Sequence, residues 1–350
     1  MPQTVEIYPS VVQAISLAEN DSGDLLWKKE LANAITSTHQ LLKELNLDNY
    51  LHIADSQPDF KCLVTPGYLR KMETGNINDP LLRQVLPLLE ENNPQSQANG
   101  VGDPVGDIDA MNTPGLLHKY HGRALLISTG ACAIHCRYCF RRHYPYQQSS
   151  CASSVLEQAL EYLEQHTEID EIILSGGDPL ILDNEKLASL IHRLESIRHI
   201  KTLRIHSRLA VVLPSRINQG LLQLLQSCRF DVVMVIHANH ANELQAIESS
   251  KLHQLHQAGV TLLNQSVLLK GINDQADTLA TLSKRLLTCK TLPYYLHLLD
   301  PVKGAMHFEV TQHRAMQLKT QLEQKLPGYL VPKLVQEIAG KQAKTAIFRI

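Results

Sequence analysis

Three cysteines near the middle of the chain have the spacing of an iron–sulfur site. Cys132, Cys136 and Cys139 lie in the segment CAIHCRYCF, with three residues between the first pair and two between the second. Three thiolates can bind three irons of a [4Fe–4S] cubane and leave the fourth iron without a protein ligand. An iron left open in this way can bind a small molecule. The spacing therefore favours a cluster that takes part in chemistry.

Two other interpretations of the triplet are a structural zinc site and three unrelated cysteines. Zinc usually takes four ligands, and His135 or His143 could supply the fourth. The triplet follows a predicted strand and precedes the aromatic Phe140, which favours the cluster. The other four cysteines show no ligand spacing and are expected to be small buried hydrophobic residues: Cys62, Cys151, Cys228 and Cys289.

The elements that position the triplet follow from hydrophobic periodicity. Short apolar runs alternate with longer amphipathic segments after residue 110. The runs are 124–128, 171–175, 203–206, 232–237, 261–267 and 294–298, and the amphipathic segments are 153–166, 184–197, 215–228, 241–258, 275–288 and 311–325. Parallel strands need crossover helices, so six such units predict an α/β fold with a parallel sheet. Six units are too few for an eight-unit barrel, and we expect a partial (βα)6, TIM-like barrel with its chemistry at the carboxyl ends of the strands.

The first part of the chain shows a different pattern. Residues 1 to about 90 carry apolar stripes that predict an N-terminal helical extension covering the larger domain. Residues 91–110 are rich in Gly, Pro, Asn and Asp, which is typical of a linker. We therefore expect an N-terminal region and linker over 1–110 and a core over 111–350.

Composition limits the classes of partner. The chain has 350 residues, 44% of them hydrophobic, and a net charge of −2 without a charged block, so neither nucleic acid nor a membrane is expected as a partner. No secretory signal begins the chain, and no apolar run approaches the roughly 18 residues that a membrane span needs. We expect a cytoplasmic protein.

The triplet after the first strand of this pattern resembles the radical SAM superfamily. The resemblance implies that S-adenosylmethionine (SAM) binds the open iron through its amino and carboxylate groups, and that an electron from the cluster releases a 5′-deoxyadenosyl radical. Gly176, Gly177 and Asp178 end the second strand and resemble the segment that contacts the SAM amino group, with backbone N–H groups as candidate donors. His237 and Gln265 resemble further SAM contacts by position.

Nearly the whole chain is similar to the lysine 2,3-aminomutase family. The similar segments include GLLHKYHGRALL, CRYCFRRHYPY, SGGDPL, HANHANE, PYYLHLLDPVKGAMHF and GYLVPKL. The resemblance is greatest to the branch that acts in β-lysylation of translation elongation factor P (EF-P). It implies an isomerase that converts L-α-lysine to β-lysine and that uses pyridoxal phosphate (PLP) beside the [4Fe–4S] cluster and SAM.

The resemblance also assigns the PLP site. Lys344 matches the lysine that holds PLP as a Schiff base, and Thr345 keeps the Lys-Thr pair of the family. The preceding segment GKQA departs from the glycine-rich family pattern, and Lys341 lies only three residues away. Arg123 matches the cation that binds the PLP phosphate, and Lys119 matches a second basic position.

The substrate contacts implied by the family are one arginine and two carboxylates. Arg141, beside Arg142, matches the residue that binds the substrate carboxylate, where a guanidinium can donate two parallel hydrogen bonds. Asp300 and Glu337 match the partners of the side-chain ammonium. Glu337 replaces an aspartate of the family, which leaves the handedness of the product open.

The implied partners are L-lysine, an electron donor of the flavodoxin or ferredoxin type and, functionally, the EF-P lysyl-ligase, with a homo-oligomer also considered. One alternative function is an aminomutase for another amino acid such as glutamate or arginine. Two carboxylates in the substrate site argue against an acidic side chain. Another alternative is a non-catalytic iron–sulfur module that supports the modification machinery.

Overall fold

A single mixed sheet organises the molecule. The computed structural model describes residues 17–146 and 153–347, and within them ten strands pair in chain order. β3 to β9 are parallel, whereas β1 and β2 at one edge and β10 at the other are antiparallel. The strands are β1 Met111–Thr113, β2 Leu116–Tyr120, β3 Arg123–Thr129, β4 Glu171–Gly176, β5 Thr202–Ser207, β6 Asp231–Ile236, β7 Thr261–Val267, β8 Leu292–His297, β9 Lys333–Gln336 and β10 Thr345–Ala346.

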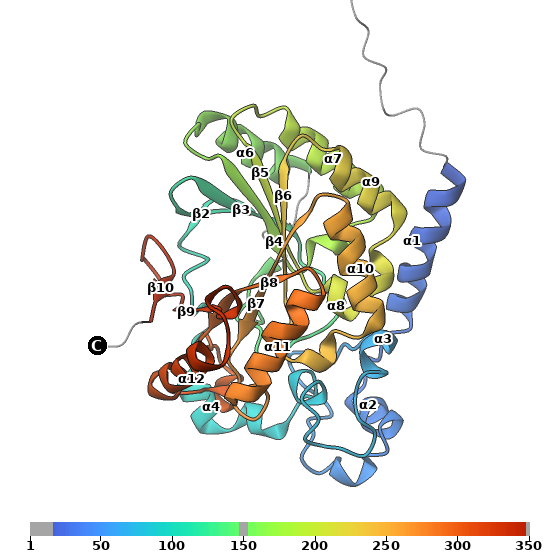
Figure 1. Cartoon of the computed structure of the whole chain (residues 1–350), viewed down its shortest axis with the longest axis vertical. Helices are drawn as coiled ribbons and strands as arrows, with labels where there is room; N and C mark the ends of the chain where they lie inside the picture. The colour runs from blue at the N-terminus through green and yellow to red at the C-terminus, as the bar shows by residue number, and fades with distance from the viewer. Residues whose placement is uncertain (1–16, 147–152, 348–350) are drawn as a thin grey trace, which may run out of the picture.

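The crossover helices cover the outside of this curved sheet (Figure 1). They are α6 Ser153–Gln165, α7 Asn184–Glu195, α9 Gln219–Ser227, α10 Ala246–Gln257, α11 Ala276–Thr288 and α12 Gln312–Lys325, and a short α8 Leu209–Val212 follows β5. The predicted α/β, partial (βα)6 arrangement is confirmed. The structure adds β9 as a further parallel strand, whose four residues are too few to show a period in the sequence.

Helix α7 shows why these segments fold as they do. Its apolar residues Leu187, Leu190, Ile191 and Leu194 are all buried on one face. The side chain of Asp183 accepts a hydrogen bond from the Lys186 N–H at 2.9 Å and caps the first turn. The spacing of the apolar residues determines which face of α7 packs on the sheet. The cap determines where the helix begins.

The N-terminal region is less helical than its apolar stripes suggest. It contains α1 Leu17–Ala32, α2 Thr38–Glu44, α3 Pro66–Leu69 and, in the predicted linker, α4 Pro94–Ala98. The rest of residues 45–93 forms turns and 3-10 segments, so the predicted helical extension is only partly helical. Asn46 has a φ of 55°, a left-handed conformation that ends α2. Residues 1–16 of the predicted extension lie outside the described residues.

The N-terminal residues nevertheless share a core with the barrel. Trp27 and Leu82 belong to the same buried cluster as Leu203 of β5, and α1 packs beside α9 (Figure 1). The predicted boundary at residue 110 stays a prediction, since no separate N-terminal core accompanies it. Cys62 and Cys289 are buried as expected, Cys228 is half-buried, and Cys151 lies outside the described part of the chain. Among the helices described, none combines the length and the hydrophobicity of a membrane span.

Candidate active site

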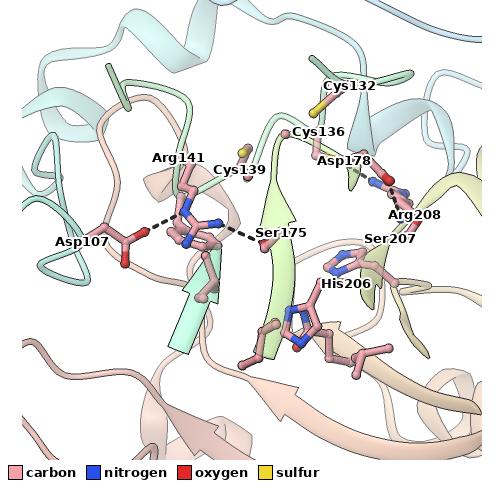
Figure 2. A pocket seen from close by; sticks show the side chains of 18 of the residues that line it. Asp107, Cys132, Cys136, Cys139, Arg141, Ser175, Asp178, His206, Ser207 and Arg208 are labelled. Carbon is pink, nitrogen blue, oxygen red and sulfur yellow. Dashed lines mark hydrogen bonds and ion pairs between the residues drawn. The ribbon is translucent and has the colours of Figure 1, made fainter. Parts of the chain in front are cut away.

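A cavity of about 480 Å³ opens inside the barrel and is lined by strands on every side and by the C-terminal hairpin. All of the residues predicted from the sequence to bind a cofactor, the cluster or the substrate line it. Figure 2 shows the three cysteines on the loop after β3, with Arg141 and His206 further along the wall. The topology thus brings together residues from Arg123 to Lys344.

The cysteine triplet fits an iron–sulfur cluster by the chemistry of its sulfur atoms. Burial, together with the neighbouring Cys139, raises the pKa of the Cys132 thiol well above its usual value, and burial raises that of Cys139 to about 11. Thiols so placed become thiolates when irons supply positive charge. No three His, Cys, Asp or Glu side chains of the described residues are arranged to share one metal ion. A cubane does not require that, because each thiolate binds a different iron.

The two glycines at the end of β4 allow a close approach between the strand and the cluster loop. The Gly177 N–H donates to the Thr129 carbonyl at 2.7 Å, and the Asp178 N–H donates to the Ala131 carbonyl at 2.8 Å. A Cβ on Gly177 would lie 2.2 Å from the Ala131 oxygen. The glycines therefore let β4 pack directly on the cluster loop. The N–H groups of Gly177 and Asp178 are thus used within the protein, and the contact of Gly176 and Gly177 with SAM stays a prediction.

Two other predicted SAM contacts, Asp178 and His237, already have partners in the structure. The Asp178 carboxylate accepts hydrogen bonds from the Arg208 N–H at 2.7 Å and the Leu180 N–H at 3.1 Å, and burial raises its pKa to about 6. His237 Nε2 lies 2.9 Å from the Tyr138 hydroxyl. Burial, and then the charge of Arg208, lower the pKa of His237 to about 3, so its ring is neutral. Their contacts with SAM stay predictions, as does that of Gln265.

A hairpin brings Lys344 into the cavity. β9 and β10 pair antiparallel with Thr345 opposite Gln336, and Gly340 turns the chain with a φ of 78°. Lys344 Nζ consequently lies 2.7 Å from Glu337 Oε2, whereas Lys341 is exposed near the tip. The altered segment before Lys344 thus still returns that lysine to the cavity. Its role in binding PLP stays a prediction.

The two basic residues predicted near the PLP phosphate differ in their partners. The Arg123 guanidinium lies 4.7 Å from the centre of the Tyr120 ring, and no acidic partner for it is found within the described residues. Lys119 instead contacts Asp107 at 2.5 Å, Glu337 at 3.2 Å and the Val105 carbonyl at 2.8 Å. Arg123 therefore fits a phosphate group, but Lys119 is already neutralised by carboxylates.

Arg141 is held by an aspartate that the sequence places in a linker. Its Nε donates to Asp107 at 2.6 Å and its Nη1 to the Ser175 hydroxyl at 3.1 Å (Figure 2). The neighbouring Arg142 turns away and binds Glu91 at 2.8 Å. The structure thus separates the two arginines, and only the first has a carboxylate partner that also lines the cavity. Nothing in the loop composition around Asp107 signals this role.

The two carboxylates predicted to bind an ammonium differ in charge. Burial raises the pKa of Asp300 to about 7, and the charge of Glu337 adds to this rise. One oxygen of Asp300, Oδ1, is buried without a hydrogen-bond partner among the described residues. Burial alone would raise the pKa of Glu337 as well, but Lys344 and Lys119 lower it to about 2. A cationic ligand would complete the bonding of Asp300.

Two histidines in the cavity wall were missed by sequence reasoning. His206 of β5 and His297 of β8 each have a buried Nε2 without a partner among the described residues. Burial and nearby cations keep the pKa of both rings well below its usual range, so both are neutral. Their only sequence signal is an inward-facing position near a strand end.

The comparisons with known proteins agree with this geometry. The radical SAM superfamily profile matches residues 126–282. The chain is 45% identical to proteins named L-lysine 2,3-aminomutase from Escherichia coli (92% of this chain, 94% of the relative) and Haemophilus influenzae (91% and 94%). It is 32% identical to the L-lysine 2,3-aminomutase of Clostridium subterminale over 92% of this chain and 77% of that one. The predicted resemblance is confirmed, and the chain belongs to the lysine 2,3-aminomutase family of the radical SAM superfamily.

Proposed function

We propose that this protein converts L-α-lysine to β-lysine with a [4Fe–4S] cluster, SAM and PLP. One observation carries the proposal: a single cavity combines the cysteine triplet, a lysine suited to PLP, an arginine without an acidic partner among the described residues, and opposite charges suited to the two ends of lysine. Bound PLP would turn the substrate amine into a group that can migrate between adjacent carbons. The protein's own residues bind and orient the reactants.

The charges in the cavity define how the substrate would lie. Arg141 faces the carboxylate end, and Asp300 with Glu337 faces the ammonium end. Glu337 is paired with Lys344 in the structure at 2.7 Å. Lys344 would use its amine to hold PLP, and Glu337 Oε2 would then be free to accept from an incoming ammonium, while Oε1 keeps its contact with Lys119 at 3.2 Å.

The alternatives are less well supported by the same residues. A glutamate side chain would meet the carboxylates of Asp300 and Glu337 and be repelled. A non-catalytic iron–sulfur module would need neither a cation for phosphate nor a lysine in the cavity, and both are present. An arginine substrate carries a longer cationic side chain and is separated from lysine by the experiment below.

The direct test is isomerisation of labelled lysine. Protein reconstituted anaerobically with iron and sulfide is incubated with dithionite, SAM, PLP and ¹³C-labelled L-lysine, and the products are separated on a chiral column. We expect labelled β-lysine, with L-arginine and L-glutamate unchanged in parallel reactions. The Cys139→Ala variant should give none. An intact cluster that cleaves SAM yet yields no β-lysine would refute the lysine assignment.

The pKa of Asp300 predicts a pH dependence of lysine binding. Because that pKa is raised to about 7, the carboxylate is mostly neutral at pH 6 and mostly ionised at pH 8. An ammonium binds the ionised form, so affinity should rise with pH up to about 7, by at most about tenfold per pH unit for one proton. Calorimetric titration of the cofactor-loaded protein at several pH values measures this dependence.

The control for this dependence is L-norleucine, which lacks the side-chain ammonium but shares the α-amine chemistry. The affinity for lysine should rise more steeply with pH than that for norleucine. In Asp300→Asn the affinities for lysine and norleucine should change equally with pH. Equal slopes in the unmodified protein would show that Asp300 does not bind the ammonium.

We further propose the biological setting implied by the family resemblance. The β-lysine would serve modification of EF-P by its lysyl-ligase in the cytoplasm, and a flavodoxin or ferredoxin would reduce the cluster. The similarity to the E. coli and H. influenzae relatives along nearly their whole length supports a shared role. A mass shift of EF-P that depends on this protein in cells tests the link. Light scattering of the purified protein tests the proposed homo-oligomer.

A further inference from the structure

The N-terminal region holds the loop that carries the cluster cysteines. The His135 N–H donates to the Leu63 carbonyl at 3.0 Å, and the Arg137 N–H donates to the Gln84 carbonyl at 2.9 Å. These two donors stand on either side of Cys136. Its backbone is therefore positioned by residues that lie more than fifty positions earlier in the chain.

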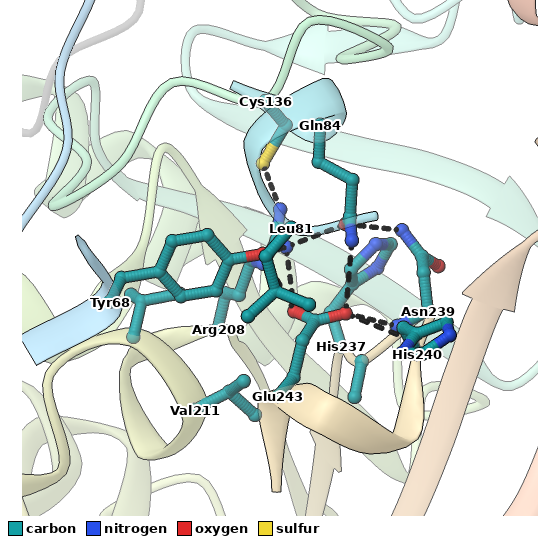
Figure 3. A network of polar contacts seen from close by, with 12 residues as sticks. Tyr68, Leu81, Gln84, Cys136, Arg208, Val211, His237, Asn239, His240 and Glu243 are labelled. Carbon is teal, nitrogen blue, oxygen red and sulfur yellow. Dashed lines mark hydrogen bonds and ion pairs between the residues drawn. The ribbon is translucent and has the colours of Figure 1, made fainter. Parts of the chain in front are cut away.

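The sulfur of the same cysteine has a cationic partner. Arg208 Nη1 donates to Cys136 Sγ at 2.6 Å. Its other terminal nitrogen, Nη2, donates to Gln84 Oε1 and Glu243 Oε2, both at 2.8 Å, and to the Tyr68 hydroxyl at 3.1 Å. Figure 3 shows these polar contacts around the Arg208 guanidinium. Two of the partners, Gln84 and Tyr68, belong to the N-terminal region.

Gln84 is the centre of the network. It is fully buried, and its Oε1 also accepts from the Tyr138 hydroxyl at 3.2 Å and from Asn239 Nδ2 at 3.0 Å. Its Nε2 donates to the Pro80 carbonyl at 3.0 Å and to Glu243 at 3.3 Å. Both polar atoms of this amide are thus used. Nothing in the sequence around Gln84 indicates that it lies at the centre of this hydrogen-bond network.

Hydrogen bonds to a cluster sulfur, together with local charge, tune the reduction potential of an iron–sulfur cluster. Reduction adds negative charge, which a donor and a cation on the sulfur stabilise. The carboxylate of Glu243 acts in the opposite sense on the same arginine.

We propose that Gln84 is a positioning residue of the cluster, which keeps Arg208 on Cys136 and thereby sets the cluster's reduction potential. The proposal rests on the cluster of the proposed function. It makes the N-terminal region part of the redox site and more than a cover for the barrel.

The test is a redox titration of the full-length, reconstituted protein, followed by electron paramagnetic resonance of the reduced cluster. In Gln84→Leu the guanidinium loses one acceptor and moves toward Glu243, so the midpoint potential should fall and the spectrum should change. In Glu243→Gln a negative charge beside the arginine is removed, so the potential should rise. A general loss of packing would not shift the midpoint potentials of the two variants in opposite directions.

The control is Ser215→Ala, which removes a contact of the barrel with Glu30 of the N-terminal region at 2.7 Å but involves neither the cluster loop nor a partner of Arg208. The midpoint potential of this variant should equal that of the unmodified protein. An unchanged potential in Gln84→Leu, or an equal shift in Ser215→Ala, overturns the proposal. If Gln84→Leu binds no iron, a potential that does not rise in Glu243→Gln overturns it instead. The titration needs neither PLP nor lysine, so failure of the lysine chemistry leaves its result readable.

Discussion

Replacing Lys344 by alanine is expected to abolish both PLP retention and lysine turnover. The hairpin of β9 and β10 directs this side chain into the cavity beside Glu337. Without an amine at that place PLP has no covalent attachment, and turnover should fall by roughly a hundredfold or more, as for other essential catalytic groups. The visible absorption of bound PLP after gel filtration and the rate of β-lysine formation measure the two losses.

The matched control is Lys341→Ala, in the same hairpin. Lys341 is exposed near the tip, so this variant should keep both the absorption and the activity. The iron content of both variants should be unchanged, because neither lysine contacts the cluster loop. PLP absorption that survives in Lys344→Ala and disappears in Lys341→Ala would reverse the assignment.

Replacing Glu91 by alanine is expected to destabilise the protein strongly. The buried Glu91 carboxylate accepts from Arg137 Nε at 2.7 Å and Nη2 at 2.6 Å, and from Arg142 Nη2 at 2.8 Å. Its loss would leave two arginines of the cluster loop without their carboxylate. Removing one member of a buried ion pair typically costs about 3–5 kcal/mol in the free energy of unfolding. Thermal unfolding of the protein without cofactors measures the change as a drop of several degrees.

The neighbouring Glu90 supplies the comparison, because it is exposed and forms no ion pair within the described residues. Glu90→Ala should change the free energy of unfolding by less than about 0.5 kcal/mol. Equal melting temperatures for the two variants would mean that water replaces the Glu91 carboxylate without cost. Iron bound after reconstitution should also fall in Glu91→Ala, since Arg137 and Arg142 flank Cys139.

The parallel core could be predicted because each of its units carries a local signal. Apolar runs bounded by amphipathic helices identify β3 to β8 and their crossovers, and the Leu187 to Leu194 stripe is one example. The N-terminal region lacks such a signal. There Trp27 is buried while its neighbours Leu25 and Leu26 are exposed, because burial depends on distant residues rather than on a regular period.

The residues of the candidate site likewise fall into those that the sequence could predict and those that it could not. Cys132, Arg141 and Lys344 could be named because they lie in recognisable segments. Asp107, Glu91 and Gln84 could not, since each acts through a partner far away in the chain and none lies in a patterned element. The glycines at the end of β4 show a further limit of prediction from sequence. Their need for close approach was predictable, but whether a ligand or the cluster loop fills that space depends on tertiary structure.

The order of the residues along the chain also bears on how the site is made during protein synthesis. Leu63, Gln84 and Glu91 precede the cysteines that they hold, so the loop and these partners have left the ribosome before most of the barrel exists. Lys344 emerges only after all of the strand–helix units. The radical-generating half of the site is therefore translated before the half that uses the radical. A nascent chain arrested after β8 would carry the cysteine loop but no lysine for the second cofactor.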